Sequence, residues 1–275
     1  RSSDLVTTDV NGQAVRYRAY EHIVYVRRPE DTATQSMNIY VPEAYFEGQS
    51  IGAYSAQTAP IFLPNQIGGY MPAEPGTPAV SSGMGPGPSG PGAILVALSR
   101  GYVVASPGAR GRTSKNAAGE LIGKAPAAIV DLKAAVRYLR FNDAAMPGSA
   151  EKIIADGTSA GGAMSALLGA TGNNQNYVPY LTALGAADAR DDIFAVSSYC
   201  PITNLEHADA AYEWQFNGVN DYQKLQISRD TSFNIQRTLV PGTLTAEEIA
   251  LSNALKPTFP AYVNSLKLQS GGQRL

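Results

Sequence analysis

The chain has 275 residues, with 21 lysines and arginines against 23 aspartates and glutamates, and its 16% of charged residues is typical of a globular protein rather than a disordered one. The charges form no run of one sign, which argues against a nucleic-acid or anionic-membrane partner and favours a small molecule. One cysteine and two histidines exclude an intramolecular disulfide and a Cys/His zinc site, and no apolar run approaches the roughly 20 residues of a membrane span.

The N-terminal part of the chain alternates apolar and polar residues. Val15 to Val26 and Met37 to Val41 follow this period of two, which predicts an opening antiparallel pair of half-buried strands. Pro60 to Pro64 is a short continuous apolar run, typical of a central strand, and it leads into the glycine loop that contains Gly68-Gly69. Proline, glycine and serine dominate from Glu74 to Gly92, which predicts a long surface loop.

Strands and helices then alternate along the chain. Helical spacing of apolar residues is clearest from Pro126 to Phe141, and short continuous apolar runs on either side of it are typical of buried strands. The repeated order of strand, helix and strand predicts a parallel sheet. The predicted elements are a short helix over 93–98, a strand over 102–107, a helix over 126–141, a strand over 152–155, a helix from 160 to about 170 and a strand over 193–197.

After Pro201 the pattern changes to longer mixed stretches. Leu205 to Phe216, Gln223 to Thr238 and Thr245 to Leu255 are each interpreted as helical, and Thr245 with Glu248 forms a capping box in the last of them. We interpret these stretches as the beginning of a helical cap. Ser270 to Leu275 is flexible in composition and is predicted to close no element.

Gly157-Thr158-Ser159-Ala160-Gly161 fits the G-x-S-x-G nucleophile elbow and lies between a predicted strand and a predicted helix, as that motif requires. The tight turn needs small neighbours and places the serine in a strained conformation. We therefore predict that Ser159 is the catalytic nucleophile and that the N–H of Ala160, at the positive end of the helix, is one oxyanion donor. The alternative is that Ser159 only caps the helix.

The second oxyanion donor is predicted in the glycine loop, at Gly69 or Gly68, because this loop follows an earlier strand as the fold requires. The alternative there is an ordinary Gly-Gly turn. A Ser-His-acid hydrolase also needs an acid and then a histidine after the nucleophile. His22 precedes Ser159, and His207 follows it by 48 positions, directly after the next strand. We interpret His207 as a cap or supporting residue and as a candidate substrate contact; the alternative is that it is the base.

Longer stretches around these motifs resemble the bacterial tannases, the tannin acyl hydrolases. They run from Gly157 to Asn173, from Tyr199 to Trp214 and from Gly68 to Met71. The resemblance implies an α/β-hydrolase fold, a mostly parallel central sheet flanked by helices with a large inserted cap. It also implies hydrolysis of galloyl and related phenolic-acid esters through a Ser-Asp-His triad, without a metal or another cofactor. Ser159 matches the family's nucleophile, and Ala160 with Gly69 or Gly68 matches its oxyanion donors.

The resemblance also implies that part of the machinery lies elsewhere. The family's triad acid and histidine, and the cap residues that hold the galloyl ring, lie near its C-terminus and have no counterpart here. We therefore expect residues 1–204 to form the N-terminal part of the hydrolase core, residues 205–275 to begin the cap, and the C-terminal part of the fold to be missing from this chain. A second polypeptide segment of the same precursor is the expected partner that completes the triad.

Other functions remain open at this stage. A feruloyl esterase or a general carboxylesterase shares the elbow, a peptidase of the same fold would need a peptide anchor for which the sequence offers no sign, and a non-catalytic ligand-binding relative could keep the scaffold. Position 1 is an arginine, and this non-Met start favours a secreted or periplasmic location over a cytoplasmic one.

Overall fold

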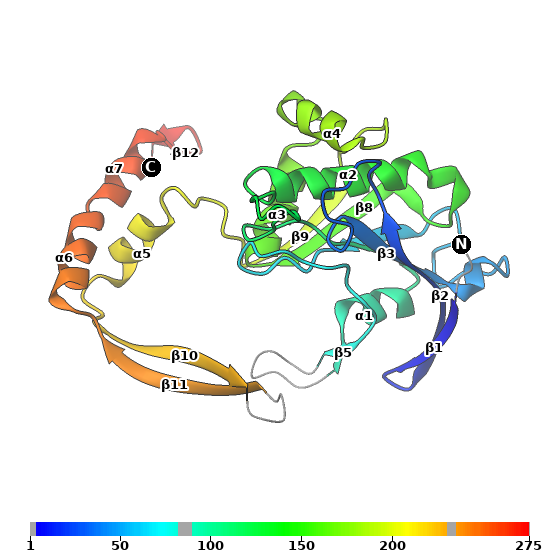
Figure 1. Ribbon diagram of the computed structural model, residues 1–275, viewed down its shortest axis with the longest axis horizontal. Helices are drawn as coiled ribbons and strands as arrows, with labels where there is room; N and C mark the ends of the chain where they lie inside the picture. Colours follow the sequence, from blue (N-terminus) through cyan, green and yellow to red (C-terminus); the bar gives the residue numbers. More distant parts are fainter. Residues whose placement is uncertain (1–3, 82–89, 230–234, 275) are drawn as a thin grey trace. The chain divides into compact units, whose positions relative to one another are not determined.

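The structure is a computed structural model that describes residues 4–81, 90–229 and 235–274. It divides into two compact units, Arg1–Thr203 and Asn204–Leu275, both drawn in Figure 1. No helix in the described ranges combines the length and the apolar character needed to cross a lipid bilayer.

The first unit is built on a seven-stranded sheet with the order β1-β2-β3-β7-β4-β8-β9. The strands β7, β4, β8 and β9 run parallel, whereas β1, β2 and β3 are joined to one another and to β7 by antiparallel pairing. The sheet therefore has a parallel half, which carries the predicted elbow, and an antiparallel half formed by the N-terminal strands. Its strands are β1 (Asp4–Val10), β2 (Gln13–Val24), β3 (Ser36–Pro42), β4 (Pro60–Pro64), β7 (Val103–Pro107), β8 (Ser149–Thr158) and β9 (Ala195–Tyr199).

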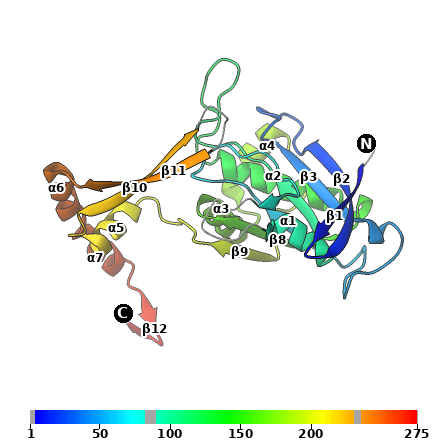
Figure 2. The same ribbon diagram turned by 90° about the horizontal axis from the view of Figure 1, so that it is seen from below.

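Helices cover both faces of this sheet. In Figure 1, α2 (Ala127–Phe141) and α3 (Ala160–Ala170) lie on one side of the strands and α1 (Ala93–Ser99) lies on the other, the side turned toward the viewer in Figure 2. The remaining helix of this unit is α4 (Val178–Leu184), and the short 3-10 turns are η1 (Glu43–Tyr45), η2 (Asp143–Ala145) and η3 (Gln175–Tyr177).

Two apolar clusters fill the space between the sheet and its helices. Because side chains alternate along a strand, Val103 and Ala105 of β7 belong to the larger cluster with α2, whereas Val104 belongs to the smaller cluster with Leu95 and Leu98 of α1. All five of these side chains are buried. Burial on both faces explains why β4 and β7 are continuous apolar runs in the sequence.

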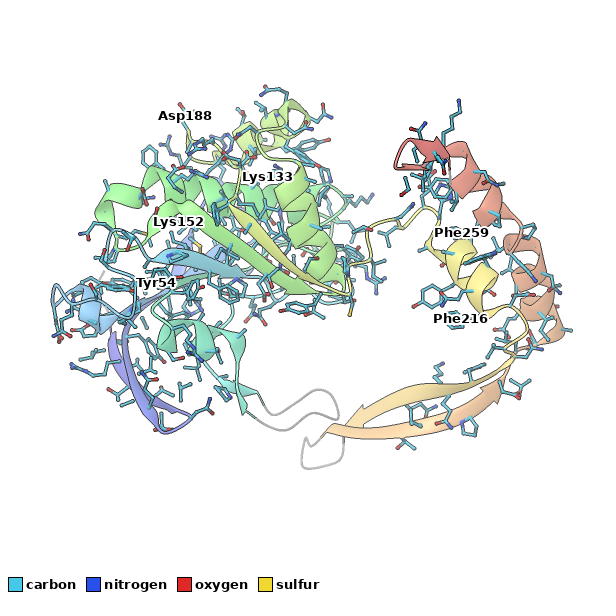
Figure 3. The ribbon with its side chains drawn as sticks, turned by 180° about the vertical axis from the view of Figure 1, so that it is seen from behind. Tyr54, Lys133, Lys152, Asp188, Phe216 and Phe259 are labelled. Atoms are coloured by element: carbon cyan, nitrogen blue, oxygen red, sulfur yellow. The ribbon has the colours of Figure 1, made fainter. Side chains whose placement is uncertain are left out.

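A buried ion network ties α2 to the loop before β9. The Lys133 ammonium lies 2.8 Å from one oxygen of Asp191, and the Arg137 guanidinium lies 2.8 Å from the other. The N–H of Asn173 donates to the same carboxylate at 2.8 Å. Burial by itself would raise the pKa of Asp191, but these hydrogen bonds outweigh it and the pKa is lowered. Lys133 is labelled in Figure 3.

Most predicted elements of the first unit are confirmed. The antiparallel opening pair is β2 with β3, the central strand is β4, and the two longest predicted helices are α2 and α3. The sequence patterns did not predict β1 or α4. In the proline- and glycine-rich stretch, residues 82–89 lie outside the described ranges, and the residues next to them form the short pair β5 (Val80–Ser81) and β6 (Gly90–Pro91).

The second unit contains helices and two antiparallel pairs. Thr245 and Glu248 form the predicted capping box, with the Thr245 N–H donating to Glu248 at 2.7 Å and the Glu248 N–H donating back at 3.2 Å. Its elements are α5 (Ala208–Phe216), β10 (Asp221–Arg229), β11 (Ile235–Thr243), α6 (Ala246–Leu255), α7 (Thr258–Ser265), β12 (Gln269–Ser270) and β13 (Gln273–Arg274).

Two predictions for this unit are wrong. The helix predicted over Gln223 to Thr238 is wrong for the described residues, because β10 and β11 pair there as antiparallel strands. Leu225 and Ile227 are two residues apart, as apolar residues on one face of a strand are, and they pair with Leu239 and Arg237. Two apolar residues are too few to distinguish a strand from a helix in the sequence. The stretch after Ser270 does close an element, since β13 pairs with β12.

Candidate active site

Ser159 lies at the sharp turn between β8 and α3. Its backbone has φ 58° and ψ −119°, a conformation that residues with a side chain rarely adopt. The N–H of Ser159 donates to the carbonyl of Tyr199 at 2.9 Å, and its carbonyl accepts from the N–H of Ala163 at 2.9 Å. Strand β9 and helix α3 thus hold the strained turn from both sides, and the Ser159 side chain is exposed. The catalytic role of Ser159 stays a prediction.

Three glycines around Ser159 are required by close backbone approach. A Cβ on Gly157 would lie 2.4 Å from the Gly161 carbonyl oxygen, and one on Gly161 would lie 2.6 Å from Oδ1 of Asn65. A Cβ on Gly162 would lie 2.6 Å from the carbonyl oxygen of Tyr199. Side-chain carbons essentially never approach heavy atoms this closely, so the glycines of the motif let β4, β9 and α3 meet at the turn.

The glycine loop after β4 adopts a tight backbone conformation. Gly69 and Tyr70 both have φ 57°, and the N–H of Met71 donates to the carbonyl of Gly68 at 3.0 Å. Within the ranges that the structure describes, neither Gly68 nor Gly69 donates a backbone hydrogen bond. The first N–H groups of a helix also have no intrahelical acceptor, and Ala160 is the first residue of α3. These predicted donors are therefore available to an anion.

Ser159 and Gly68 line the same cavity, whose volume is about 590 Å³. The structure thus brings together the two sequence motifs that were predicted to form the site, with Ala160 and Gly69 next to them in the chain. The assignment of the oxyanion donors stays a prediction. The cavity wall also includes Asn65 at the end of β4 and Asp156 of β8, which the sequence patterns did not single out.

Asp156 is the one titratable side chain among the described residues that line this cavity. Burial raises its pKa, and a hydrogen bond with Ser197 offsets part of that effect. It precedes the nucleophile in the chain, whereas the acid of a hydrolase triad in this fold follows it. No sequence signal marked Asp156, because it is an internal residue of a strand.

The histidines lie apart from these motifs in the sequence. His207 belongs to the second unit, where its ring stacks on Tyr262 with 3.6 Å between ring centroids. Its backbone N–H donates to Oδ1 of Asn204 at 3.2 Å. Its role as a substrate contact stays a prediction. The backbone N–H of His22 on β2 donates to Asn38 at 2.9 Å. Among the described residues, no group of three or more His, Cys, Asp or Glu side chains could hold a metal ion.

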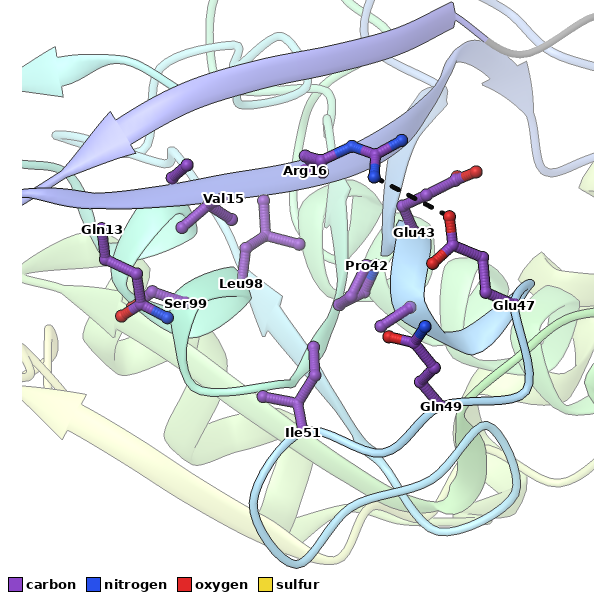
Figure 4. A pocket seen from close by; sticks show the side chains of 12 residues that line it. Gln13, Val15, Arg16, Pro42, Glu43, Glu47, Gln49, Ile51, Leu98 and Ser99 are labelled. Carbon is purple, nitrogen blue, oxygen red and sulfur yellow. Dashed lines mark ion pairs between the residues drawn. The ribbon is translucent and has the colours of Figure 1, made fainter.

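A second, smaller cavity of about 210 Å³ lies between β2, the η1 turn and the end of α1 (Figure 4). Its charged side chains are paired with one another or with a neighbour. Arg16 lies 3.8 Å from Glu47, and Glu43 binds Arg18 at 2.7 Å. Ser99 also lines this cavity, but its hydroxyl donates to the carbonyl of Val96 at 2.8 Å, within its own helix. Because the charges are already compensated and the hydroxyl is engaged in α1, the cavity at Ser159 is the candidate active site.

Comparisons with known proteins agree with this geometry. The model of an α/β-hydrolase family described as BD-FAE matches residues 90–242. The tannase structure from Fusobacterium nucleatum is similar at 55% identity and a TM-score of 0.91, over 99% of this chain and 57% of that one. A tannase structure from Lactobacillus plantarum is similar at 47% identity and a TM-score of 0.90, over 99% and 58%.

A structure described as tannin acyl hydrolase in complex with ethyl gallate is similar at 49% identity and a TM-score of 0.86, over 99% of this chain and 57% of that one. The chain therefore spans less than two thirds of the length of the solved structures that it matches. No curated protein matches it.

Proposed function

Because this chain belongs to the BD-FAE family of α/β-hydrolases and shares the fold of bacterial tannases over nearly its whole length, we propose that it carries the nucleophile of a serine esterase for galloyl esters. The observation that carries this proposal is Ser159, held at φ 58° between β8 and α3 in a cavity that it shares with the glycine loop. The neighbour described with bound ethyl gallate supports a phenolic-acid ester as the substrate.

The proposed reaction is an acyl transfer through Ser159. The Ser159 hydroxyl oxygen attacks the ester carbonyl while a histidine takes its proton, and the N–H groups of Ala160 and of Gly69 or Gly68 stabilise the tetrahedral oxyanion. The bond to the alcohol oxygen then breaks, and the alcohol leaves with the proton from the histidine. Water attacks the resulting acyl-enzyme, which releases the phenolic acid and restores the Ser159 hydroxyl.

The histidine and the acid of the triad come, in this proposal, from a second segment of the same precursor. This chain covers only 57% and 58% of two tannase structures, so a further segment of such a protein could supply both residues. The outer strand β9 supports it too, since within the described residues β9 pairs only with β8. Phe194, directly before β9, and Tyr199, its last residue, are 66% and 59% exposed. An apolar sheet edge of this kind is normally covered by further structure.

The proposed reaction is tested with the intact protein and its Ser159→Ala variant, assayed on methyl gallate. We expect the variant to lose four or more orders of magnitude in kcat, roughly as other serine hydrolases do. Ser99→Ala, at the partly exposed end of α1, is the matched control and is expected to keep full activity. Residual activity in Ser159→Ala near that of the wild type would contradict the proposal.

Assays of the intact protein with other substrates and probes distinguish the alternative functions. Equal turnover of methyl ferulate and methyl gallate would point to a feruloyl esterase or a general carboxylesterase. Failure of a fluorophosphonate probe to label Ser159 would favour a ligand-binding relative.

Intact mass spectrometry under denaturing conditions tests for the second segment. A polypeptide that copurifies with the 29.0 kDa chain, or a longer chain that contains it, supports the proposal. A sample of only 29.0 kDa that is fully active would contradict it.

A further inference from the structure

Asn65 is the first residue after β4, and only 8% of its surface is exposed. Its side-chain amide is saturated with hydrogen bonds. Nδ2 donates to the carbonyl of Asp156 at 2.9 Å, to the hydroxyl of Ser165 at 2.9 Å and to the carbonyl of Gly161 at 3.2 Å. Oδ1 accepts from the N–H of Ile67 at 3.2 Å. A buried amide with all its groups satisfied has one favoured orientation.

These partners belong to the separate segments that meet at the candidate active site. Asp156 lies in β8, directly before the elbow, whereas Gly161 and Ser165 lie in the first turns of α3. Ile67 begins the glycine loop that contains Gly68 and Gly69. One side chain therefore joins the loop that offers one oxyanion donor to the strand and helix that offer the other.

The glycines of the elbow make room for this amide. A Cβ on Gly157 would lie 2.7 Å from Nδ2 of Asn65, and a Cβ on Gly161 would lie 2.6 Å from Oδ1. The two glycines that flank Ser159 at a distance of two residues thus face the same side chain. The absence of a Cβ at these glycines has a role beyond the turn itself, because it makes room for a side chain from the loop that follows β4.

We propose that Asn65 is a positioning residue for the oxyanion hole, which sets the distance between the glycine-loop N–H and the N–H of Ala160. This inference rests on the proposed esterase function of the same site. Oxyanion donors act at hydrogen-bond distance from a defined point, so a displaced donor stabilises the transition state less while ground-state binding of the substrate changes little. Asn65 does not touch the substrate in this proposal.

The chemistry of an amide is specific at this position. An aspartate has the same shape, but its second oxygen would face the carbonyl oxygens of Asp156 and Gly161 without a hydrogen to donate. A glutamine is one methylene longer, and the contacts to Gly157 and Gly161 leave no space for it. We therefore expect no other side chain to substitute fully for Asn65.

The test compares Asn65→Ala with Asn173→Ala in the intact protein. Asn173 is a matched control because its amide also joins two segments, binding Asp191 and Asp192 near the other end of α3. Each variant is assayed on methyl gallate, and its affinity for phenylboronic acid, which forms a tetrahedral adduct with a serine hydroxyl, is measured. We expect Asn65→Ala to lower kcat about 10- to 100-fold and to weaken the boronate in parallel, with KM within about threefold. Asn173→Ala is expected to lose stability but to keep kcat and boronate affinity.

Several outcomes overturn the inference. A folded Asn65→Ala variant with the kcat of the wild type does so, and so does one that loses kcat while its boronate affinity is unchanged. Should Asn65→Ala not fold, Asn65→Ser supplies the same comparison, because its shorter hydroxyl cannot reach both the loop and α3. A wild-type protein without esterase activity contradicts the proposed function, whereas an active wild type with equally active Asn65 variants contradicts only the role of Asn65.

Discussion

The two units of the chain are packed in different ways. In the first, side chains such as Leu132, Leu139 and Ile153 are completely buried in a continuous cluster. In the described part of the second, only Ala210 and Ser252 are buried, and the helices meet through exposed aromatic contacts. The first unit therefore supplies its own core and can hold a strained turn, whereas the described part of the second leaves large apolar side chains such as Trp214 and Leu251 exposed.

After Ser159→Ala, the largest effect is expected from Gly162→Ala in the first unit. The new Cβ would lie 2.6 Å from the carbonyl oxygen of Tyr199. Neither the backbone of β9 nor that of α3 can move aside without distorting the turn at Ser159. We expect kcat on methyl gallate to fall about 100-fold or more, since a small misplacement of the site costs about that much.

Gly169→Ala in the same helix is the matched control. The one close contact of its Cβ would be with Cγ2 of Val196, at 2.5 Å, in an exposed side chain and not in the backbone, while Ile193 lies at an ordinary 3.9 Å. We expect this variant to keep its activity. Equal losses in the two variants would contradict the requirement for backbone contact at Gly162.

Asp191→Ala tests the buried ion network of the first unit. It leaves the fully buried Lys133 without its carboxylate, and we expect the free energy of unfolding to fall by about 3–5 kcal/mol in urea titrations. Glu151→Ala is the control, because Glu151 is 63% exposed where it binds Arg140 and Arg190, and it should cost less than about 1 kcal/mol. Similar losses of unfolding free energy in the two variants would show that the burial of the ion pair does not determine its contribution to stability.

The same network predicts a pH dependence. The pKa of Asp191 is lower in the folded protein than the value near 3.9 expected for an unfolded aspartate. Its contribution to stability is therefore complete above about pH 4 and is lost as the pH falls through the folded pKa. We expect the difference in unfolding free energy between the wild type and Asp191→Ala to shrink below that pH. A difference that grows on acidification would contradict the lowered pKa.

Leucine truncations compare the two units directly. Leu139 is fully buried in the core, so Leu139→Ala is expected to cost about 2–5 kcal/mol of unfolding free energy. Leu251 on α6 is 59% exposed, and Leu251→Ala in the isolated 275-residue chain is expected to cost less than about 0.5 kcal/mol. A large loss for Leu251→Ala would mean that the second unit has a core of its own.

The smallest effect concerns the order of unfolding in the isolated 275-residue chain. Trp214 is the single tryptophan, it lies in the second unit, and it is 51% exposed. We expect its fluorescence to change at a lower urea concentration than the far-ultraviolet circular dichroism, to which the first unit contributes most. Coincident transitions would show that the two units unfold together.

Much of the first unit could be predicted from sequence. The helix α2 and the strands β4 and β7 have long or continuous apolar patterns that allow one interpretation. The helix predicted over Gln223 to Thr238 was wrong, because the stretch has too few apolar residues to fix a period until its pairing partner is known. The capping box at Thr245 was predicted correctly because it is complete within four residues.

The sequence by itself determined the sharp turn at Ser159, since the demand for small residues around it is local and is visible within the six residues from Gly157 to Gly162. Only the tertiary structure decided what fills the space that those glycines leave, because Asn65 follows β4 and is far from the turn in the sequence. It likewise decided that Asp156 lines the cavity. A residue that acts through contacts across a sheet carries no local pattern, because its neighbours are chosen by the order of the strands and not by the order of the chain.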